Sequence, residues 1–222
     1  ALTFLYIAWR LPKVPSGGGF SPRKLPELLR HKGIIGLYLF TLLISSAIYV
    51  AYSYIEPFLK QVSLMPDDWV TTALMVFGGA GLLGSIAFSK YYNRNRKLFI
   101  TVNVAAMALC LLLLYPVSSG FLPIIVLLAV WGATATAYNV AMQSNMILVT
   151  TPESTPVAMS IFSGIFNLGI GSGAFFGGAI CSDLSISYIG LAGGVLALIG
   201  LVYWVARLGN RIEPKDTLDK YL

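Results

Sequence analysis

Long uncharged runs dominate this chain, and short polar breaks separate them. The first complete run, from Ile34 to Ile55, holds 22 residues without a charge. Because the hydrocarbon core of a bilayer is about 30 Å thick and a helix rises about 1.5 Å per residue, about 20 apolar residues can cross it. The pattern therefore predicts six membrane-spanning helices: Ile34–Leu59, Trp69–Phe88, Leu98–Val117, Leu122–Val149, Pro156–Ile180 and Ile186–Ala206.

The runs favour an all-α membrane protein, since strands of a membrane barrel would alternate apolar and polar residues and these runs do not. A further apolar stretch, Ala1–Trp9, is expected to be the end of a truncated transmembrane helix, so we interpret the chain as the C-terminal part of a longer protein. Residues 10–33 then form a linker, residues 34–206 a six-helix bundle and residues 207–222 a tail.

Composition and charge support this division. Only 11% of the residues are charged and the mean hydropathy is +0.78, whereas soluble domains carry about 25% charged residues. Of the 15 basic residues, all except Lys60 fall in the linker, in the second loop or in the tail. Short basic loops stay cytoplasmic, so the linker and the C-terminus are expected to be cytoplasmic. The net charge of +6 is thereby explained without a nucleic acid partner.

The chain offers little material for catalysis or metal binding. It has one histidine, His31, and two cysteines, Cys110 and Cys181, which form neither a disulfide framework nor a metal site. We expect no enzyme activity, no metal and no cofactor.

A polar stripe runs along the first span. Thr41, Ser45, Tyr49, Tyr52 and Glu56 are spaced 4, 4, 3 and 4 residues apart, which places them on one helix face. Lipid cannot satisfy such a stripe, so it faces protein or water. One interpretation is a helix lining a polar cavity. The other is that the hydroxyls bond to their own helix and the tyrosines form an interfacial belt.

Similar stripes occur in the fourth and fifth spans. Thr136, Asn139 and Gln143 share one face, and Ser160, Ser163 and Asn167 share another. Intramembrane amides bind either neighbouring helices or a ligand. The groups are neutral, which suits a sugar-like solute, although an amphipathic drug could use them too. The residues predicted to contact the solute are Tyr49, Tyr52, Asn139, Gln143, Ser163 and Asn167.

Glycine-rich segments mark the second and fifth spans, "GGAGLLGS" at 78–85 and "GIGSGAFFGG" at 169–178. They occupy matching places in two triples of spans, which predicts a 3+3 inverted repeat. Gly169, Gly173 and Gly177 form a G-x-x-x-G ladder that predicts close helix packing, either static or at a surface that moves.

Glu56 and Pro57 end the first span. Counting about 20 residues from Ile34 puts Glu56 near the membrane boundary, so the pair indicates a helix exit. Because Glu56 also continues the Tyr49–Tyr52 stripe, it is a candidate gate or proton relay at the mouth of the cavity.

Three segments resemble a known family. "AYSYIEPF", "GGAGLLGS" and "VAMSIFSGIFNLGIGSGA" are similar to bacterial sugar efflux transporters of the major facilitator superfamily, in its drug:proton antiporter branch. The likeness covers the C-terminal half of such a protein, from the end of its sixth helix through its twelfth. It implies a twelve-helix, two-bundle transporter of the bacterial inner membrane, which exports sugars or related solutes by proton antiport and alternating access.

Two departures qualify that resemblance. In "GSIAFSKYYNRNRK" the superfamily's loop signature keeps Gly84, but Phe88 stands where the acid is expected. The N-terminal six-helix bundle, where such antiporters commonly carry their proton-coupling acid, is not in this chain. The alternatives are a multidrug/proton antiporter of the same superfamily and, from a different class, a structural membrane subunit without transport activity.

Overall fold

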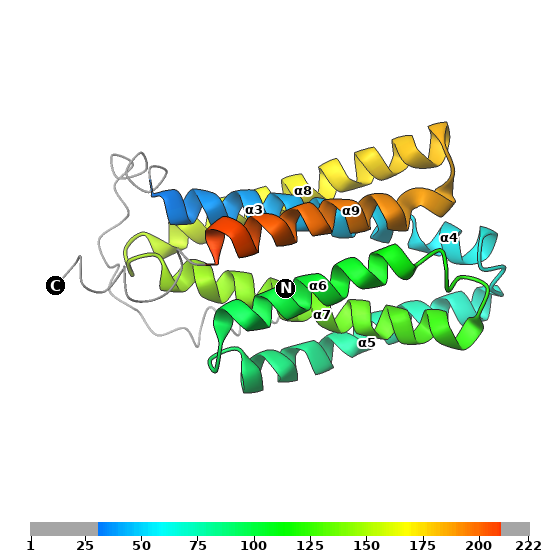
Figure 1. Cartoon of the computed structure of the whole chain (residues 1–222), viewed down its shortest axis with the longest axis horizontal. Coiled ribbons are helices and arrows are strands. Elements are labelled where there is room, and N and C mark those ends of the chain that lie inside the picture. Colours follow the sequence, from blue (N-terminus) through cyan, green and yellow to red (C-terminus); the bar gives the residue numbers. More distant parts are fainter. Residues whose placement is uncertain (1–30, 210–222) are drawn as a thin grey trace, which may run out of the picture.

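The computed structural model describes residues 31–209, and this range is helical, with short connections (Figure 1). Six helical segments in it are long and apolar enough to cross a membrane. The six predicted spans are thus confirmed as apolar helices. The expectations for residues 1–9, for most of the linker and for the tail beyond residue 209 lie outside the described residues.

The element bounds differ from the predicted ones by a few residues. The elements are α3 (Lys32–Tyr52), α4 (Ile55–Gln61), α5 (Asp67–Tyr91), α6 (Arg96–Leu113), α7 (Phe121–Leu148), α8 (Thr155–Asp183), the 3₁₀ turn η2 (Ile186–Tyr188), α9 (Ile189–Tyr203) and the π-helical turn η3 (Trp204–Leu208).

The first span is not the single helix that the sequence predicts. It breaks at Ser53 and Tyr54, and α4 continues from Ile55. Pro57 explains the position of the break, because a proline has no N–H and its ring clashes with the carbonyl four residues earlier, here that of Ser53. Within α4, Pro57 occupies the first turn, where no intrahelical N–H bond is needed.

Local signals also set the ends of α5 and α6. α5 begins with Asp67 and Asp68, whose carboxylates complement the positive end of the helix dipole. The Asn95 side chain caps α6 by accepting a hydrogen bond from the Leu98 N–H at 2.9 Å. α6 ends at Leu113, four residues before the predicted Val117, because Pro116 cannot continue the helix.

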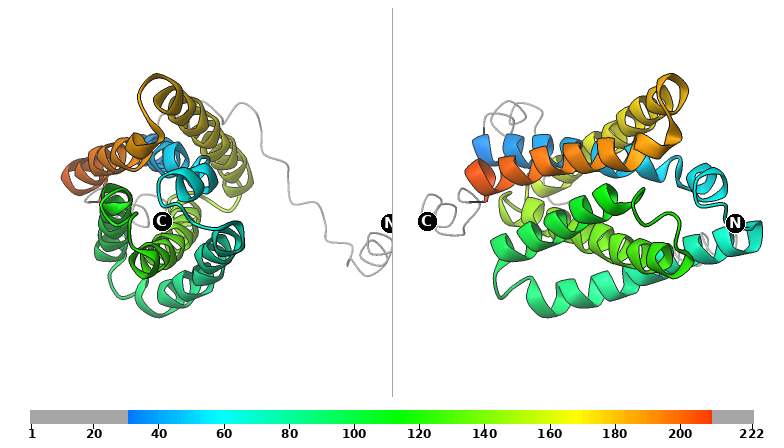
Figure 2. Two further views of the ribbon diagram at one scale, coloured as in Figure 1. Left: turned by 90° about the vertical axis from the view of Figure 1, so that its right-hand side faces the viewer. Right: turned by 45° about the vertical axis from the view of Figure 1, so that its right-hand side comes forward.

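The long helices form two rows of three and alternate in direction along the chain (Figures 1 and 2). In one row α3 lies between α8 and α9, and in the other α7 lies between α5 and α6. α6 and α9 pack against each other and join the rows along one side. The two central helices, α3 and α7, contribute several of the largest fully buried side chains, among them Phe40, Tyr138 and Trp131.

Aromatic contacts bind the end of α9 to the core. Trp204 stacks on Phe40 with ring centroids 5.1 Å apart, and Phe40 meets Tyr138 edge-on at 5.8 Å. The Trp204 indole N–H donates to the Thr101 hydroxyl at 3.1 Å. Outside this core many large apolar side chains are exposed, for example Leu82 and Leu83 of α5 at 72% and 64%. Such a surface suits lipid or other helices rather than water.

Candidate functional site

Five aromatic rings from four helices meet in one place, which we call the aromatic cluster. The rings belong to Tyr49 and Tyr52 of α3, Phe77 of α5, Trp131 of α7 and Phe166 of α8. Tyr52 stacks on Phe77 with centroids 4.9 Å apart, and Phe77 meets Trp131 edge-on at 5.3 Å. Tyr49 contacts Tyr52 at 5.7 Å and Phe166 at 6.3 Å, both edge-on. The rings therefore connect all four helices.

Glycines bring the four helices close enough for these contacts. A methyl group at Gly132 would collide with the Phe77 carbonyl, so α7 and α5 touch backbone to backbone beside the Phe77–Trp131 pair. On the other side, a methyl at Gly173 would lie 2.6 Å from the Ser46 carbonyl oxygen and 3.0 Å from Tyr49 Cβ. Because glycine has no Cβ, α8 can thus approach α3 closely near Tyr49 and Phe166.

The aromatic cluster lies deep in the helices. Phe77 and Trp131 each follow the start of their helix by ten residues, or about 15 Å at 1.5 Å per residue. Trp131 is fully buried, and its indole N–H has no hydrogen-bond partner within residues 31–209. The other four rings are half-buried, and those of Tyr49, Tyr52 and Phe77 pack against the core. The cluster offers flat apolar faces, with tyrosine hydroxyls as polar tips.

Two amides of α7 form a pair two to three turns beyond Trp131. Gln143 Nε2 donates to Asn139 Oδ1 at 2.5 Å. Asn139 is half-buried and Gln143 is exposed. Each amide can both donate and accept, and in the described chain the Asn139 amino group and the Gln143 carbonyl have no partner. The pair can therefore present one donor and one acceptor to a ligand.

α8 carries a second polar face. Ser163 and Asn167 are exposed, and Asn167 Nδ2 donates to the Ser163 backbone carbonyl at 2.8 Å. Asn167 directly follows Phe166, so it lies near the edge of the aromatic cluster. Since lipid satisfies no exposed amide, this face of a membrane-crossing helix requires water or further protein beside it.

The predicted stripe on the first span divides into three parts. Thr41 and Ser45 are fully buried, and the Ser45 hydroxyl donates to the Thr41 carbonyl at 2.6 Å. The cavity interpretation is therefore wrong for this part, and the alternative, a hydroxyl bonded to its own helix, applies to Ser45. α8 covers Ser45, because its Oγ lies against Gly169. Only Tyr49 and Tyr52 reach the aromatic cluster.

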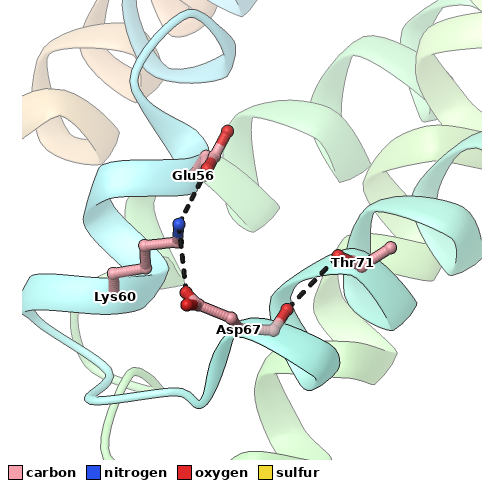
Figure 3. A network of polar contacts seen from close by, with 4 residues as sticks. All are labelled: Glu56, Lys60, Asp67 and Thr71. Carbon is pink, nitrogen blue, oxygen red and sulfur yellow. Dashed lines mark hydrogen bonds and ion pairs between the residues drawn. The ribbon is translucent and has the colours of Figure 1, made fainter.

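Glu56 lies apart from the aromatic cluster, in an ionic network between α4 and α5 (Figure 3). Lys60 Nζ lies 3.0 Å from Glu56 Oε1 and 3.0 Å from Asp67 Oδ1. These side chains border an open hollow that Val70, Leu74 and Met75 also line. The three charged side chains are exposed by 41% to 84%, so water screens both pairs and each adds little to the stability of the fold.

The glycine ladder of α8 lies against α3. Beside Gly169 and Gly173, a methyl at Gly177 would lie 2.5 Å from the Val50 carbonyl oxygen. The ladder thus faces the backbone of one helix over three consecutive positions.

Sequence reasoning missed Phe77, Trp131 and Phe166. One of them carried a usable signal, since Trp131 precedes Gly132, at which the α5 backbone approaches α7. An aromatic residue next to a glycine in a membrane helix marks a place where a neighbouring backbone can approach a large ring. Among the described residues, no cluster of three histidine, cysteine or acidic side chains could hold a metal ion.

Comparison with known families adds one finding. The sequence profile of the Major Facilitator Superfamily matches residues 96–220, more than half of the chain. The matched segment includes Trp131, Asn139, Gln143 and the α8 residues of the site, whereas Tyr49, Tyr52 and Phe77 precede it.

Proposed function

Because this chain belongs to the Major Facilitator Superfamily, a family of membrane transporters, we propose that it forms the C-terminal six-helix bundle of a twelve-helix secondary transporter. The transporter exports sugars or related small solutes across the bacterial inner membrane, by proton antiport and alternating access. Helices α3 to α9 are then transmembrane helices seven to twelve, and the linker and tail are cytoplasmic.

The packing pattern supports a 3+3 repeat. In such a repeat α3 corresponds to α7, α5 to α8 and α6 to α9. The contact between α3 and α8 then corresponds to that between α7 and α5, and the contact between α3 and α9 to that between α7 and α6. All four contacts exist. Glycines make the close approach in two of these corresponding contacts. Gly81 and Gly84 of α5 lie against α7, and Gly169, Gly173 and Gly177 of α8 lie against α3.

The observation that carries the proposed activity is the aromatic cluster, together with side-chain amides on two of its four helices, α7 and α8. A sugar has apolar ring faces and a rim of hydroxyl groups. Aromatic faces can pack on the former, and the Asn139–Gln143 pair and Asn167 can exchange hydrogen bonds with the latter. The exposed polar face of α8 is the surface that the N-terminal bundle or a water-filled cavity covers in the complete transporter.

Proton coupling is assigned to the N-terminal bundle, with Glu56 as a gate or relay at the outer mouth. In residues 31–209, the acids of the helices lie at helix ends and Glu56 already pairs with Lys60. Because Glu56 and Lys60 both lie on α4 and Asp67 lies on α5, opening a passage between α4 and α5 would separate Lys60 from Asp67. We infer a role in access rather than direct contact with the solute.

Transport by the whole protein tests the proposal. Everted membrane vesicles with an imposed pH gradient are supplied with radiolabelled L-arabinose or methyl β-D-galactoside. We expect uptake that depends on the gradient and falls about tenfold in Trp131→Ala, because Tyr52 and Phe77 lose the buried ring against which they pack, while the amount of inserted protein is measured separately. Absence of gradient-dependent movement of both sugars would exclude sugar export.

Multidrug antiport is the second candidate, and the excess of aromatic over hydroxyl groups in the cluster favours it. A cationic dye distinguishes the two, since extrusion of the dye without sugar transport assigns the protein to drug export. A structural subunit would move neither probe.

A further inference from the structure

Two tyrosines of the first span hold α8 at points far apart. The Tyr38 hydroxyl donates to the Ala158 carbonyl at 3.0 Å, and the Tyr54 hydroxyl donates to the Ala174 carbonyl at 2.9 Å. The tyrosines are sixteen residues apart, and so are the two alanines. On a helix this spacing corresponds to about 24 Å. The two helices are therefore held in the same register at both ends of a long contact.

Between these two hydrogen bonds, α3 and α8 pack closely through small residues. The Ser46 and Ser172 hydroxyls lie 2.9 Å apart in one hydrogen bond. Gly169, Gly173 and Gly177 bring the α8 backbone directly onto α3. Glycines alone would allow one helix to slide along the other, because a smooth surface has no preferred position. The hydroxyl bonds at defined carbonyls remove that freedom.

Tyr54 has a second function at the helix break. Its ring lies on Gly177 and Gly178, where a methyl on either glycine would come within 2.8 Å of a ring atom or the hydroxyl. Tyr54 is also the N-cap residue of α4, two residues after the end of α3. The break that Pro57 imposes is thus fastened to α8 instead of hanging free.

The pair α5 and α7 differs in this respect. Gly81, Gly84 and Gly132 bring these helices equally close, but within the described range no side-chain hydrogen bond joins them. Of these two glycine-lined contacts, α3 with α8 and α5 with α7, only the first is locked by hydroxyl groups within the described range.

We propose that Tyr38 and Tyr54 are positioning residues that hold α3 and α8 as one unit, so that the spacing between Tyr49 and Phe166 in the aromatic cluster stays constant during transport. The link to transport rests on the proposed function. The fixed register of α3 on α8 is independent of the proposed function, and it is measured separately.

The first experiment measures the register by crosslinking. In the whole protein, with Cys110→Ala and Cys181→Ala, Ser46→Cys and Ser172→Cys are introduced and oxidised in vesicles. We expect a disulfide in most molecules, to the same extent with and without a proton gradient. Adding Tyr38→Phe with Tyr54→Phe should slow its formation at least about threefold, since the two bonds that hold the register are lost. Tyr188→Phe is the control, because Tyr188 is half exposed and outside this contact.

An unchanged rate in the double tyrosine variant, or a yield that depends on the gradient, would refute the unit. If the double variant does not fold, Tyr54→Phe alone is measured in the same way. Transport by the crosslinked protein that keeps both tyrosines is a further test of the unit. We expect this protein still to transport the probe. If crosslinking abolished transport and a reductant restored it, α3 and α8 would have to move apart during transport.

The second experiment concerns positioning. Tyr54→Phe should raise KM for the transported probe about three- to tenfold, as expected for the loss of one hydrogen bond, and leave kcat within about twofold. A purely structural role would lower the amount of active protein and leave KM unchanged, and that result would overturn the positioning role. If the wild type moves neither sugar nor dye, the proposed function fails, whereas crosslinking still decides the register.

Discussion

A single methyl group at Gly173 tests the packing that builds the candidate site. In Gly173→Ala the new Cβ would lie 2.6 Å from the Ser46 carbonyl oxygen and 3.0 Å from the Val50 backbone nitrogen. Real Cβ atoms essentially never come within 3.0 Å of another heavy atom, and these atoms belong to a helix backbone that cannot rotate away. α8 must therefore retreat from α3, which stretches the Ser46–Ser172 hydrogen bond and separates Phe166 from Tyr49.

The magnitude follows from two opposing terms. Overpacking costs about 1–3 kcal/mol, and alanine is favoured over glycine in a helix by about 1 kcal/mol. Gly171→Ala is the matched control, because it lies two residues away on α8 and its methyl would meet no atom of the described chain within 4 Å. Gly171→Ala receives the second term alone, so the two variants should differ by about 1–3 kcal/mol in free energy of unfolding.

Thermal unfolding of the purified protein with Cys181→Ala, followed by the reaction of the buried Cys110 with a fluorescent thiol reagent, measures the difference. For a domain of this size about 1 kcal/mol corresponds to about 2–4 °C, so Gly173→Ala should unfold several degrees below Gly171→Ala. It should also lose solute affinity. Equal melting temperatures would mean that α3 and α8 are not in backbone contact at Gly173. The contact between Tyr49 and Phe166, which depends on that approach, would then be contradicted as well.

Three further predictions concern single groups. Asn139→Ala and Gln143→Ala should each weaken solute transport while leaving membrane insertion intact, because the amide pair then loses a ligand contact; unchanged transport in both variants would remove the pair from the site. Glu56→Gln should change the rate or the pH dependence of export while leaving the melting temperature close to that of the wild type, since its ion pair is exposed; export with wild-type rate and pH profile would reduce Glu56 to an interfacial acid. Burial, partly offset by Arg96, raises the pKa of Tyr92 to about 12, above its ordinary value of about 10. Because the buried neutral phenol is favoured in the folded state, its contribution to stability is present below pH 10 and is lost as the pH rises through 12. Tyr92→Phe should therefore flatten the fall in melting temperature between pH 10 and pH 12, and an identical fall in both proteins would contradict the assignment.

Single residues show how far sequence reasoning reached in the site. Tyr49 and Tyr52 were predicted from their helical spacing, and both lie in the aromatic cluster. Thr41 and Ser45 have the same spacing but are fully buried, with Ser45 against α8, because a face that is polar in the sequence can be turned to a neighbouring helix as well as to a cavity. Asn139 and Gln143 do share a face, as their spacing requires, and their role in solute contact stays a prediction.

Within residues 31–209, hydropathy alone located the six apolar spans, because about 20 uncharged residues in a row are long enough to cross a bilayer as a helix. The sequence also contains the glycine segments that allow close packing. Which helices those glycines face follows only from the packing of the folded chain. The meeting of Phe77, Trp131 and Phe166 with Tyr49 and Tyr52 depends on contacts between residues far apart in the chain, and helical periodicity describes the faces of one helix at a time.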